Sequence, residues 1–239
     1  MDQHRKVTQA FSAMAPKYEE VLNSELQRFW GWRYKDFIDL IEEGSVINGS
    51  DRVLDIATGT GSIPERLLRE GKSYRPIHGL DITLSMLAQA RGRFERLEVA
   101  DQVLLVCASA MEMPYANGSF TYVICGLATH HMSVEKLLME SCRLLQQGGR
   151  LTMADASGAP SWKIPGAKLM LKLAAFIYFS LSEGFARAWI EAGAVSNVRT
   201  KEQWLTLLET IGFKEIDIVV LESKHAWISA PLLIRAVKS

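Results

Sequence analysis

Between residues 52 and 154, short apolar runs alternate with amphipathic helical patterns, and this alternation limits the possible folds more than any other feature. Five runs are expected to be strands, namely Arg52–Ala57, Ile77–Ile82, Gln102–Cys107, Phe120–Gly126 and Arg150–Ala154. Apolar residues at helical spacing lie between them, as in the helix with Leu137, Leu138 and Leu144, which Gly148 and Gly149 are expected to end. Strands that alternate with helices form a mainly parallel sheet with helices on both faces. The sequence therefore predicts an α/β protein.

The segments that flank this alternating region complete the predicted architecture. Residues 1–44 form an expected N-terminal helical cap, in which Pro16 separates a short helix from a longer one. Lys214–Leu221 and Trp227–Val237 are expected to be closing strands, which makes a sheet of seven strands. Residues 158–199 interrupt the alternation with an apolar helix. This last segment is expected to be a helical insertion after strand five.

Composition excludes several classes of function. The chain has 27 basic and 27 acidic residues, whereas binding to a nucleic-acid backbone requires an excess of Lys and Arg. Cys107, Cys125 and Cys142 form no CxxC pair, so neither a disulfide framework nor a metal site is expected. The longest apolar stretch, Leu173–Leu181, is too short to span a bilayer, and no signal peptide is apparent. A single domain over residues 1–239, cytoplasmic and without stable membrane insertion, is expected; an oligomer is left open.

The segment Val53–Leu68 carries the clearest functional motif, in which a strand leads through a glycine loop into a helix. Glycine lets a ligand approach the backbone, and the N–H groups at a helix N-terminus are free to bind it. The third glycine of a dinucleotide-binding motif is absent, and an acid precedes the loop, which suits a ligand with an amino group or a sulfonium. The alternative is a simple tight turn. The candidate ligand-binding residues are Asp55, Ala57, Thr58, Gly59 and Gly61.

A second acid makes this motif more specific. The second expected strand ends in Asp81, which follows Gly61 by 20 residues. At the carboxyl end of a neighbouring strand, a carboxylate can accept hydrogen bonds from both hydroxyls of a ribose. An N-cap of the next helix is the alternative, because Asp81 and Thr83 both precede that helix. The spacing favours the ribose.

These motifs resemble those of the class I S-adenosylmethionine-dependent methyltransferases, and the resemblance extends over almost the whole chain. Gly79–Asp81, Met113–Phe120 and Leu145–Leu151 follow in the order of that family, and Phe11–Trp30 is similar to the opening of the ubiquinone/menaquinone biosynthesis methyltransferases. The resemblance implies a Rossmann-like fold, S-adenosylmethionine as cofactor, and Tyr18 folded over it. The other residues implied at the cofactor are Ile82, Met86, Ser109, Ala110, Met111 and Gly126.

Three positions depart from this pattern. Ser109 stands where the family usually has an acid for the adenine amino group, and Gln147 replaces the usual proline. Leu127–His131 replaces the asparagine-containing segment of the quinone methyltransferases and is more similar to general small-molecule methyltransferases. The resemblance therefore defines the class of reaction better than it defines the acceptor.

His130 and His131 follow the fourth expected strand, and Asp155 follows the fifth. In the strand order of the family, these two strand ends open into one crevice. We expect His130, or as second choice His131, to take a proton from the acceptor, Asp155 to orient the imidazole, and Tyr18 to close over the methyl donor. A structural role as cap or packing group is the alternative for the histidines, and alignment alone can suffice for an acceptor that arrives unprotonated.

The expected function is methyl transfer from S-adenosylmethionine to a small, apolar acceptor, either quinone-like or another small metabolite. Apolar residues between Trp162 and Trp189 are expected to form a lid over this acceptor, and an ordinary core helix is the alternative. Contact with a membrane surface has weaker support, because that segment has few basic residues. A non-catalytic protein that binds S-adenosylmethionine is the main alternative, and the missing third glycine disfavours a nicotinamide oxidoreductase.

Overall fold

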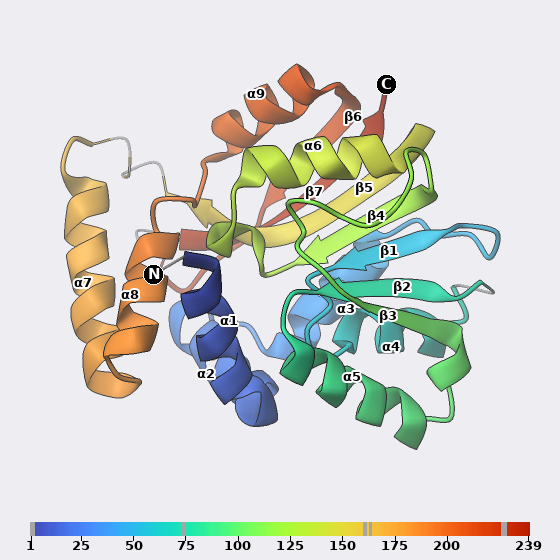
Figure 1. Ribbon diagram of the computed structural model, residues 1–239. Helices are drawn as coiled ribbons and strands as arrows, with labels where there is room; N and C mark the ends of the chain where they lie inside the picture. The colour runs from blue at the N-terminus through green and yellow to red at the C-terminus, as the bar shows by residue number, and fades with distance from the viewer. Residues whose placement is uncertain (1–2, 73–74, 160–161, 163, 226–228) are drawn as a thin grey trace.

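Seven strands form one sheet in the order β3-β2-β1-β4-β5-β7-β6 (Figure 1). The structure is a computed structural model that describes residues 3–72, 75–159, 162, 164–225 and 229–239. Neighbouring strands are parallel except for β7, which runs antiparallel to both β5 and β6. The strand order reverses between β1 and β4, and in open α/β sheets ligands bind at the carboxyl edge beside such a reversal. The predicted seven-stranded, mainly parallel fold is confirmed.

The strands are β1 (Val53–Ile56), β2 (Ile77–Asp81), β3 (Val103–Cys107), β4 (Phe120–Gly126), β5 (Leu145–Gly158), β6 (Phe213–Val220) and β7 (Ser229–Lys238). Every residue of β1 is buried, as expected for the centre of a sheet that is covered on both faces. Part of the expected seventh strand, including Trp227, lies outside the described residues.

The helices are α1 (Gln3–Met14), α2 (Tyr18–Phe29), α3 (Tyr34–Gly44), α4 (Ser62–Arg69), α5 (Leu84–Arg96), α6 (Val134–Leu144), α7 (Ala167–Ser182), α8 (Phe185–Ala194) and α9 (Lys201–Ile211). Short 3-10 turns are η1 (Ala15–Lys17), η2 (Ala100–Gln102) and η3 (Thr129–His131). Among the described residues, no helix combines the length and apolarity needed to cross a membrane.

Successive residues of the central strand point to opposite faces of the sheet and pack against different helices. Leu54 lies in a core with α6 and α9, to which Leu137 and Trp204 contribute buried side chains. Val53 lies in a second core with α3 and α4, where Phe37 is fully buried. Helices therefore cover both faces of the sheet, as predicted (Figure 1).

The junction of α6 and β5 lies earlier than the sequence predicts. Helix α6 ends at Leu144, and β5 already begins at Leu145, not at Arg150. Leu145 continues the apolar spacing of the helix, but it pairs with Phe120 of β4, and this tertiary pairing decides its conformation. The expectation that Gly148 and Gly149 end the helix is wrong, because both glycines lie within β5.

The strand also continues past its expected end. Asp155 pairs with Leu232 of β7, and β5 runs on to Gly158. The pairing of β5 with β4, however, stops at Gly126 and Ala154. Asp155 therefore lies within a strand, but at the level where the carboxyl end of β4 leaves an opening beside it.

The cap contains a break that the sequence prediction missed. The expected longer helix is divided into α2 and α3 at Trp30–Arg33, where Gly31 has φ +80°. Glycine adopts this left-handed conformation without the steric cost that other residues have. The apolar pattern continues on both sides of the break, so periodicity alone could not reveal it.

Glu19 of α2 connects the cap to the glycine loop. Its Oε1 accepts hydrogen bonds from the hydroxyls of Thr60, at 2.6 Å, and Ser62, at 2.9 Å. The same carboxylate forms an ion pair with Arg93 of α5. The cap is thereby held over the carboxyl edge of β1 and β2, and Tyr18, the neighbour of Glu19, lies beside the loop.

Candidate functional site

A cavity of about 410 Å³ lies at the carboxyl ends of β1, β2 and β4. Eleven of the predicted site residues line it: Tyr18, Ala57, Gly59, Asp81, Ile82, Met86, Ser109, Ala110, Met111, Gly126 and His131. Asp55 of β1, and Thr58 and Gly61 of the loop that follows, do not line this cavity. We call this space the first cavity.

Asp81 connects the glycine loop to β2. One carboxylate oxygen accepts a hydrogen bond from the backbone N–H of Gly59, at 3.0 Å, and the other accepts one from the N–H of Thr83, at 2.8 Å. Burial raises the pKa of Asp81, while these N–H groups act in the opposite direction. The N-cap of α5 is Thr83 and not Asp81. Because an ionised carboxylate has about four acceptor positions, Asp81 can still bind the hydroxyls of a ligand.

Asp55 is fully buried next to this carboxylate. Among the described residues, no group forms a hydrogen bond of normal geometry with either of its carboxylate oxygens. Burial raises the pKa of Asp55 to about 7; the Thr58 side chain lowers it, and the negative charge of Asp81 raises it further. A buried carboxylate without a partner is costly to ionise. A positively charged group of a ligand would remove that cost.

The two positions of the loop, Gly59 and Gly61, require glycine for different structural reasons. A Cβ on Gly59, which has φ +55°, would meet no atom closer than 3.9 Å, so the space beside this residue is open to the first cavity. A Cβ on Gly61, which has φ +85°, would lie 2.5 Å from the ring of Phe94. Gly61 therefore allows α4 to pack closely on α5, whereas Gly59 leaves room for a ligand.

A second cavity, of about 370 Å³, adjoins the first. Phe11, Tyr18, Leu127 and His131 line both spaces. The remaining walls come mainly from α2, α7 and α8 and are largely apolar, with Leu22, Leu26, Phe29, Leu171, Ala174, Ala175, Phe179 and Val195 among the lining residues. Trp162 and Tyr178 of the expected lid line the cavity, whereas Trp189 is exposed and does not.

Tyr18 and Leu127 separate the two cavities. Burial raises the pKa of Tyr18 well above its usual value, so its hydroxyl keeps its proton at neutral pH. Leu127 follows β4 with φ +51°, and its N–H donates to the carbonyl of Ala154 at 2.8 Å. A left-handed conformation is unusual for leucine, and strained residues of this kind cluster at functional sites.

His130 and Asp155 form a hydrogen-bonded pair at the second cavity. The His130 Nδ1 lies 2.6 Å from Asp155 Oδ1, and Oδ2 accepts from the backbone N–H and the hydroxyl of Thr129, each at 2.6 Å. Burial lowers the pKa of His130, but the charge and the hydrogen bond of Asp155 outweigh this effect and raise it. Burial acts to raise the pKa of Asp155, yet the charge and the hydrogen bond of His130 hold this pKa below its usual value.

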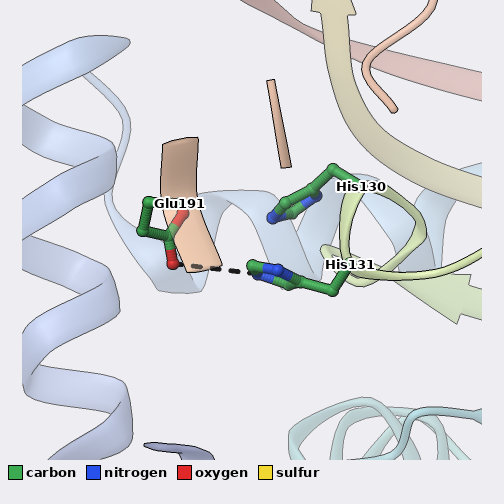
Figure 2. A group of neighbouring side chains, drawn as sticks. All are labelled: His130, His131 and Glu191. Carbon is green, nitrogen blue, oxygen red and sulfur yellow. Dashed lines mark ion pairs between the residues drawn. The ribbon is translucent and has the colours of Figure 1, made fainter. Parts of the chain in front are cut away.

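His131 has the opposite electrostatic environment. Burial lowers its pKa well below the usual value, and the charge of Arg187 and the charge that His130 carries when it is protonated act in the same direction. Figure 2 shows the two imidazoles side by side, with Glu191 facing His131; the distance from His131 Nε2 to Glu191 Oε1 is 3.9 Å. His131 is therefore neutral at neutral pH, and of the two histidines it is the weaker base.

These side chains also have the composition of a metal site. His130, His131 and Glu191 each offer one ligand atom, and these atoms lie within 4.8 Å of one another (Figure 2). However, the Nε atom of Arg187 lies 2.8 Å from Glu191 Oε1 and places a positive charge where a cation would bind. The absence of a metal, which the sequence suggested, stays a prediction.

The sequence analysis missed the charged residues of the second cavity, namely Glu25, Arg187 and Glu191. A visible pattern could have indicated Arg187 and Glu191, because Glu183, Arg187 and Glu191 are spaced four residues apart in an otherwise apolar segment. Nothing in the local sequence of Phe11 or Glu25 marks either residue, because the tertiary contact of α1 and α2 with α8 brings them to the cavity.

Comparisons with known proteins agree with this geometry. A family model described as a methyltransferase domain matches residues 53–149. A ubiquinone/menaquinone biosynthesis C-methyltransferase of Roseobacter denitrificans is 30% identical over 160 residues, which cover 65% of this chain and 61% of that protein. The chain thus spans about three fifths of the length of that relative. A demethylmenaquinone methyltransferase of Lactobacillus johnsonii is 27% identical over 231 residues, which cover 91% and 88% of the two chains.

Solved structures with the same fold include proteins of different activities. The [4+2]-cyclase SpnF is 18% identical, with a TM-score of 0.70 over 97% of this chain and 94% of that one. Geranyl diphosphate C-methyltransferase from Streptomyces coelicolor, determined with Mg²⁺, geranyl diphosphate and S-adenosyl-L-homocysteine, is 16% identical, with a TM-score of 0.68 over 93% and 84%. Residues 53–149 therefore match a methyltransferase domain, and the chain is similar in sequence to the two methyltransferases named above and shares the fold of the solved structures.

Proposed function

We propose that this protein transfers the methyl group of S-adenosylmethionine to a small aromatic acceptor of the quinol class, at a ring carbon. The observation that carries the proposal is the junction of the two cavities at Tyr18 and His131, one cavity beside the glycine loop and the other largely apolar. The similarity to a ubiquinone/menaquinone biosynthesis C-methyltransferase and to a demethylmenaquinone methyltransferase supports this class of acceptor. An acceptor in the second cavity would meet the methyl donor at the junction.

In this proposal the first cavity holds the cofactor, which supplies a methyl group on a positively charged sulfur. Asp81 binds the ribose hydroxyls with its remaining acceptor positions, and Asp55 balances the positive charge of the amino-acid part. Ser109 lies at the adenine end, where its Oγ already accepts a hydrogen bond from Met111 N–H at 3.1 Å. The protein's main contribution is alignment, which can supply about 7–11 kcal/mol.

His130 is the proposed general base. Because Asp155 accepts the hydrogen bond of Nδ1, the Nε2 of His130 is the atom left to take a proton. A carbon–carbon bond forms as the carbon–sulfur bond breaks, and the ring carbon then gives its proton to Nε2. The raised pKa of His130 and the lowered pKa of His131 favour the first of the two histidines, in agreement with the order that the sequence suggested.

Residues 158–199 cover the acceptor in this proposal. Helix α7 turns Ala174 and Phe179 toward the second cavity, while Leu173, Ile177 and Leu181 are exposed on the same helix. The enclosure of the apolar part of an acceptor by one face of the lid would exclude water from the reaction.

The test is transfer of a labelled methyl group to 1,4-dihydroxynaphthalene, kept reduced, at saturating cofactor. A general base contributes about 10²–10⁴-fold, so His130→Ala and Asp155→Asn are expected to lower turnover by at least about 100-fold. His131→Ala is the matched comparison and is expected to lose less than tenfold. Losses below tenfold in all three variants would leave alignment as the mechanism and remove His130 as the base.

A second candidate function rests on the fold comparison. SpnF has the same fold and is described as a cyclase, so the fold does not by itself fix the reaction. If this chain only binds S-adenosylmethionine, no S-adenosylhomocysteine will form with any acceptor, although calorimetry will show binding. Formation of that product together with a methylated acceptor would exclude this candidate.

A further inference from the structure

Three buried polar atoms without hydrogen-bond partners gather at the second cavity. Among the described residues, His131 Nδ1, Arg187 Nε and Glu191 Oε1 have none, and their side chains are only 10%, 11% and 13% exposed. All three residues line the cavity. Buried polar atoms are nearly always hydrogen-bonded, so a group of such atoms facing one space indicates a missing polar partner.

We propose that Glu191 and Arg187, which lie beside His131, form a binding site for a hydroxyl group of the acceptor. The assignment rests on the proposed function, in which the second cavity holds that acceptor. A guanidinium N–H can only donate a hydrogen bond and a carboxylate can only accept one, whereas a hydroxyl does both. One hydroxyl therefore satisfies Arg187 and Glu191 together.

Other ligand groups fit these atoms less well. A carbonyl or ether oxygen accepts from Arg187 but leaves the carboxylate of Glu191 without a donor. An ammonium group satisfies Glu191, but the positive charge of Arg187 repels it. A carboxylate is attracted by Arg187 and repelled by Glu191. The neutral hydroxyl is the group that matches both residues.

The protein itself satisfies the hydrogen-bond donors of Arg187 only in part. Its Nη1 donates to the thioether sulfur of Met14 at 2.9 Å, which is a weak acceptor, and Nη2 reaches the Glu25 carboxylate at 3.2 and 3.4 Å. Arg187 Nε is close to Glu191, but the pair lacks hydrogen-bond geometry. Burial raises the pKa of Glu25, Arg187 opposes this effect, and the negative charges of Glu191 and Glu183 add to it, so Glu25 compensates the guanidinium less well than an exposed carboxylate would.

Neighbouring aromatic rings hold the guanidinium in place. The Cζ of Arg187 lies 5.8 Å from the ring centroid of Phe11 and 5.9 Å from that of Phe179, within the range of cation–π interactions. The ring of His131 is 4.1 Å from that of His130, measured between centroids. The hydroxyl site is thus pre-formed and lies next to the proposed base, so it would fix the orientation of an aromatic acceptor.

The experiment compares two probes of equal shape, 1-naphthol and 1-methylnaphthalene, by fluorescence titration of the protein saturated with S-adenosylhomocysteine. Hydrogen bonds to charged groups are worth about 1.5–3 kcal/mol, so the preference for 1-naphthol is expected to fall at least about tenfold in Arg187→Met and Glu191→Met. Glu191→Gln, which keeps the side-chain volume, is expected to give a smaller loss in the same direction. This conservative variant shows whether the loss of preference in the two Met variants comes from the hydroxyl site or from unfolding of the lid.

Glu183→Gln is the matched control, because Glu183 is also four residues from Arg187 and 3.8 Å from it but does not line the cavity. Its preference for 1-naphthol is expected to equal that of the unmodified protein. The proposal is overturned by an unchanged preference in the Arg187 and Glu191 variants, by an equal loss in Glu183→Gln, or by failure of both probes to bind. Methyl transfer is measured separately: a hydroxyl preference without transfer would refute the proposed function alone, and transfer without a preference would refute this site alone.

Discussion

The two cavities of this protein are built in different ways. The first is lined by Gly59 and Asp81, and Asp55 is buried beside them. These three residues lie within 27 residues of one another in the sequence, and Asp81 is held by backbone N–H groups. The polar wall of the second joins α2, η3 and α8, which are far apart in the sequence, through Glu25 and Arg187 among others. A site made by one local motif can be recognised in the sequence, whereas a site made by docked helices cannot.

The unsatisfied polar atoms also differ between the two cavities. Beside the first cavity, both oxygens of Asp55 lack partners among the described residues, which leaves an unbalanced negative charge. At the second, Arg187 Nε and Glu191 Oε1 are a donor and an acceptor in the same place. The first arrangement favours a cationic ligand group and the second a neutral group that both donates and accepts. The predictions that follow test whether this contrast is real.

The largest expected effect is that of Asp55→Asn on the stability of the cofactor-free protein. A pKa of about 7 in place of the usual 3.8 corresponds to about 4 kcal/mol of destabilisation when the pH is above both values. Because the pKa is raised in the folded state, this cost is absent below about pH 4 and develops fully as the pH rises through 7. Asp55→Asn is therefore expected to raise the free energy of unfolding at pH 8, by up to about 4 kcal/mol.

The same substitution should weaken binding of S-adenosylmethionine, since the amide cannot balance a positive charge. Denaturant unfolding at pH 5 and pH 8, with calorimetric titration of the cofactor, measures both effects. If the stability difference between the two proteins does not depend on pH, Asp55 is not the buried, unpaired carboxylate described above. A gain in stability without a loss of affinity would contradict its proposed role toward the cofactor.

Asp81→Ala has the next largest expected effect. Loss of hydrogen bonds to a charged group costs about 1.5–3 kcal/mol, so the dissociation constant of S-adenosylmethionine is expected to rise about 10–150-fold. Asp81→Asn, which keeps one acceptor oxygen, should lose less. Calorimetry on the folded variants provides the measurement. Affinity equal to that of the unmodified protein would remove Asp81 from the site and break the assignment of the first cavity to the cofactor.

The two glycines allow a sharper version of the same comparison. Gly61→Ala should destabilise the fold by about 1–3 kcal/mol in addition to the cost of its positive φ, because its Cβ would lie 2.5 Å from Phe94 and must overpack the α4–α5 contact. Gly59→Ala meets no such clash and should cost about 1–2 kcal/mol for its positive φ, while it lowers cofactor affinity. Thermal unfolding and calorimetry of both variants separate these effects. A larger affinity loss in Gly61→Ala, at equal stability, would reverse the assignment.

The sequence predicted the sheet, the glycine loop and Asp81 because each depends on a short local pattern: buried runs, turn residues and spacing. Its errors occur where tertiary contacts decide the conformation. Leu145 continues a helical pattern and yet pairs with β4, and the break at Gly31 lies inside an apolar stripe. Arg187 could not be assigned to the second cavity from the sequence, because its position there depends on the contact of α8 with α1 and α2.

The smallest expected effect concerns the adenine end of the first cavity, where the family resemblance implies an acid and this chain has Ser109. Its Oγ already accepts a hydrogen bond from Met111 N–H, so one of its acceptor positions is used by the protein itself. Ser109→Asp keeps an oxygen for this N–H and adds a second, charged acceptor, which is expected to tighten S-adenosylmethionine binding by less than about tenfold. Titration of S-adenosylmethionine and of its deaminated analogue, which has a carbonyl in place of the adenine amino group, tests this explanation, because only the first ligand has the amino group that would donate to the new carboxylate. Equal changes for the two ligands would mean that the carboxylate alters the loop and does not contact the amino group. A large loss of affinity would instead show that the Ser109–Met111 turn shapes the cavity, and that in this half of the molecule the backbone matters more than side-chain charge.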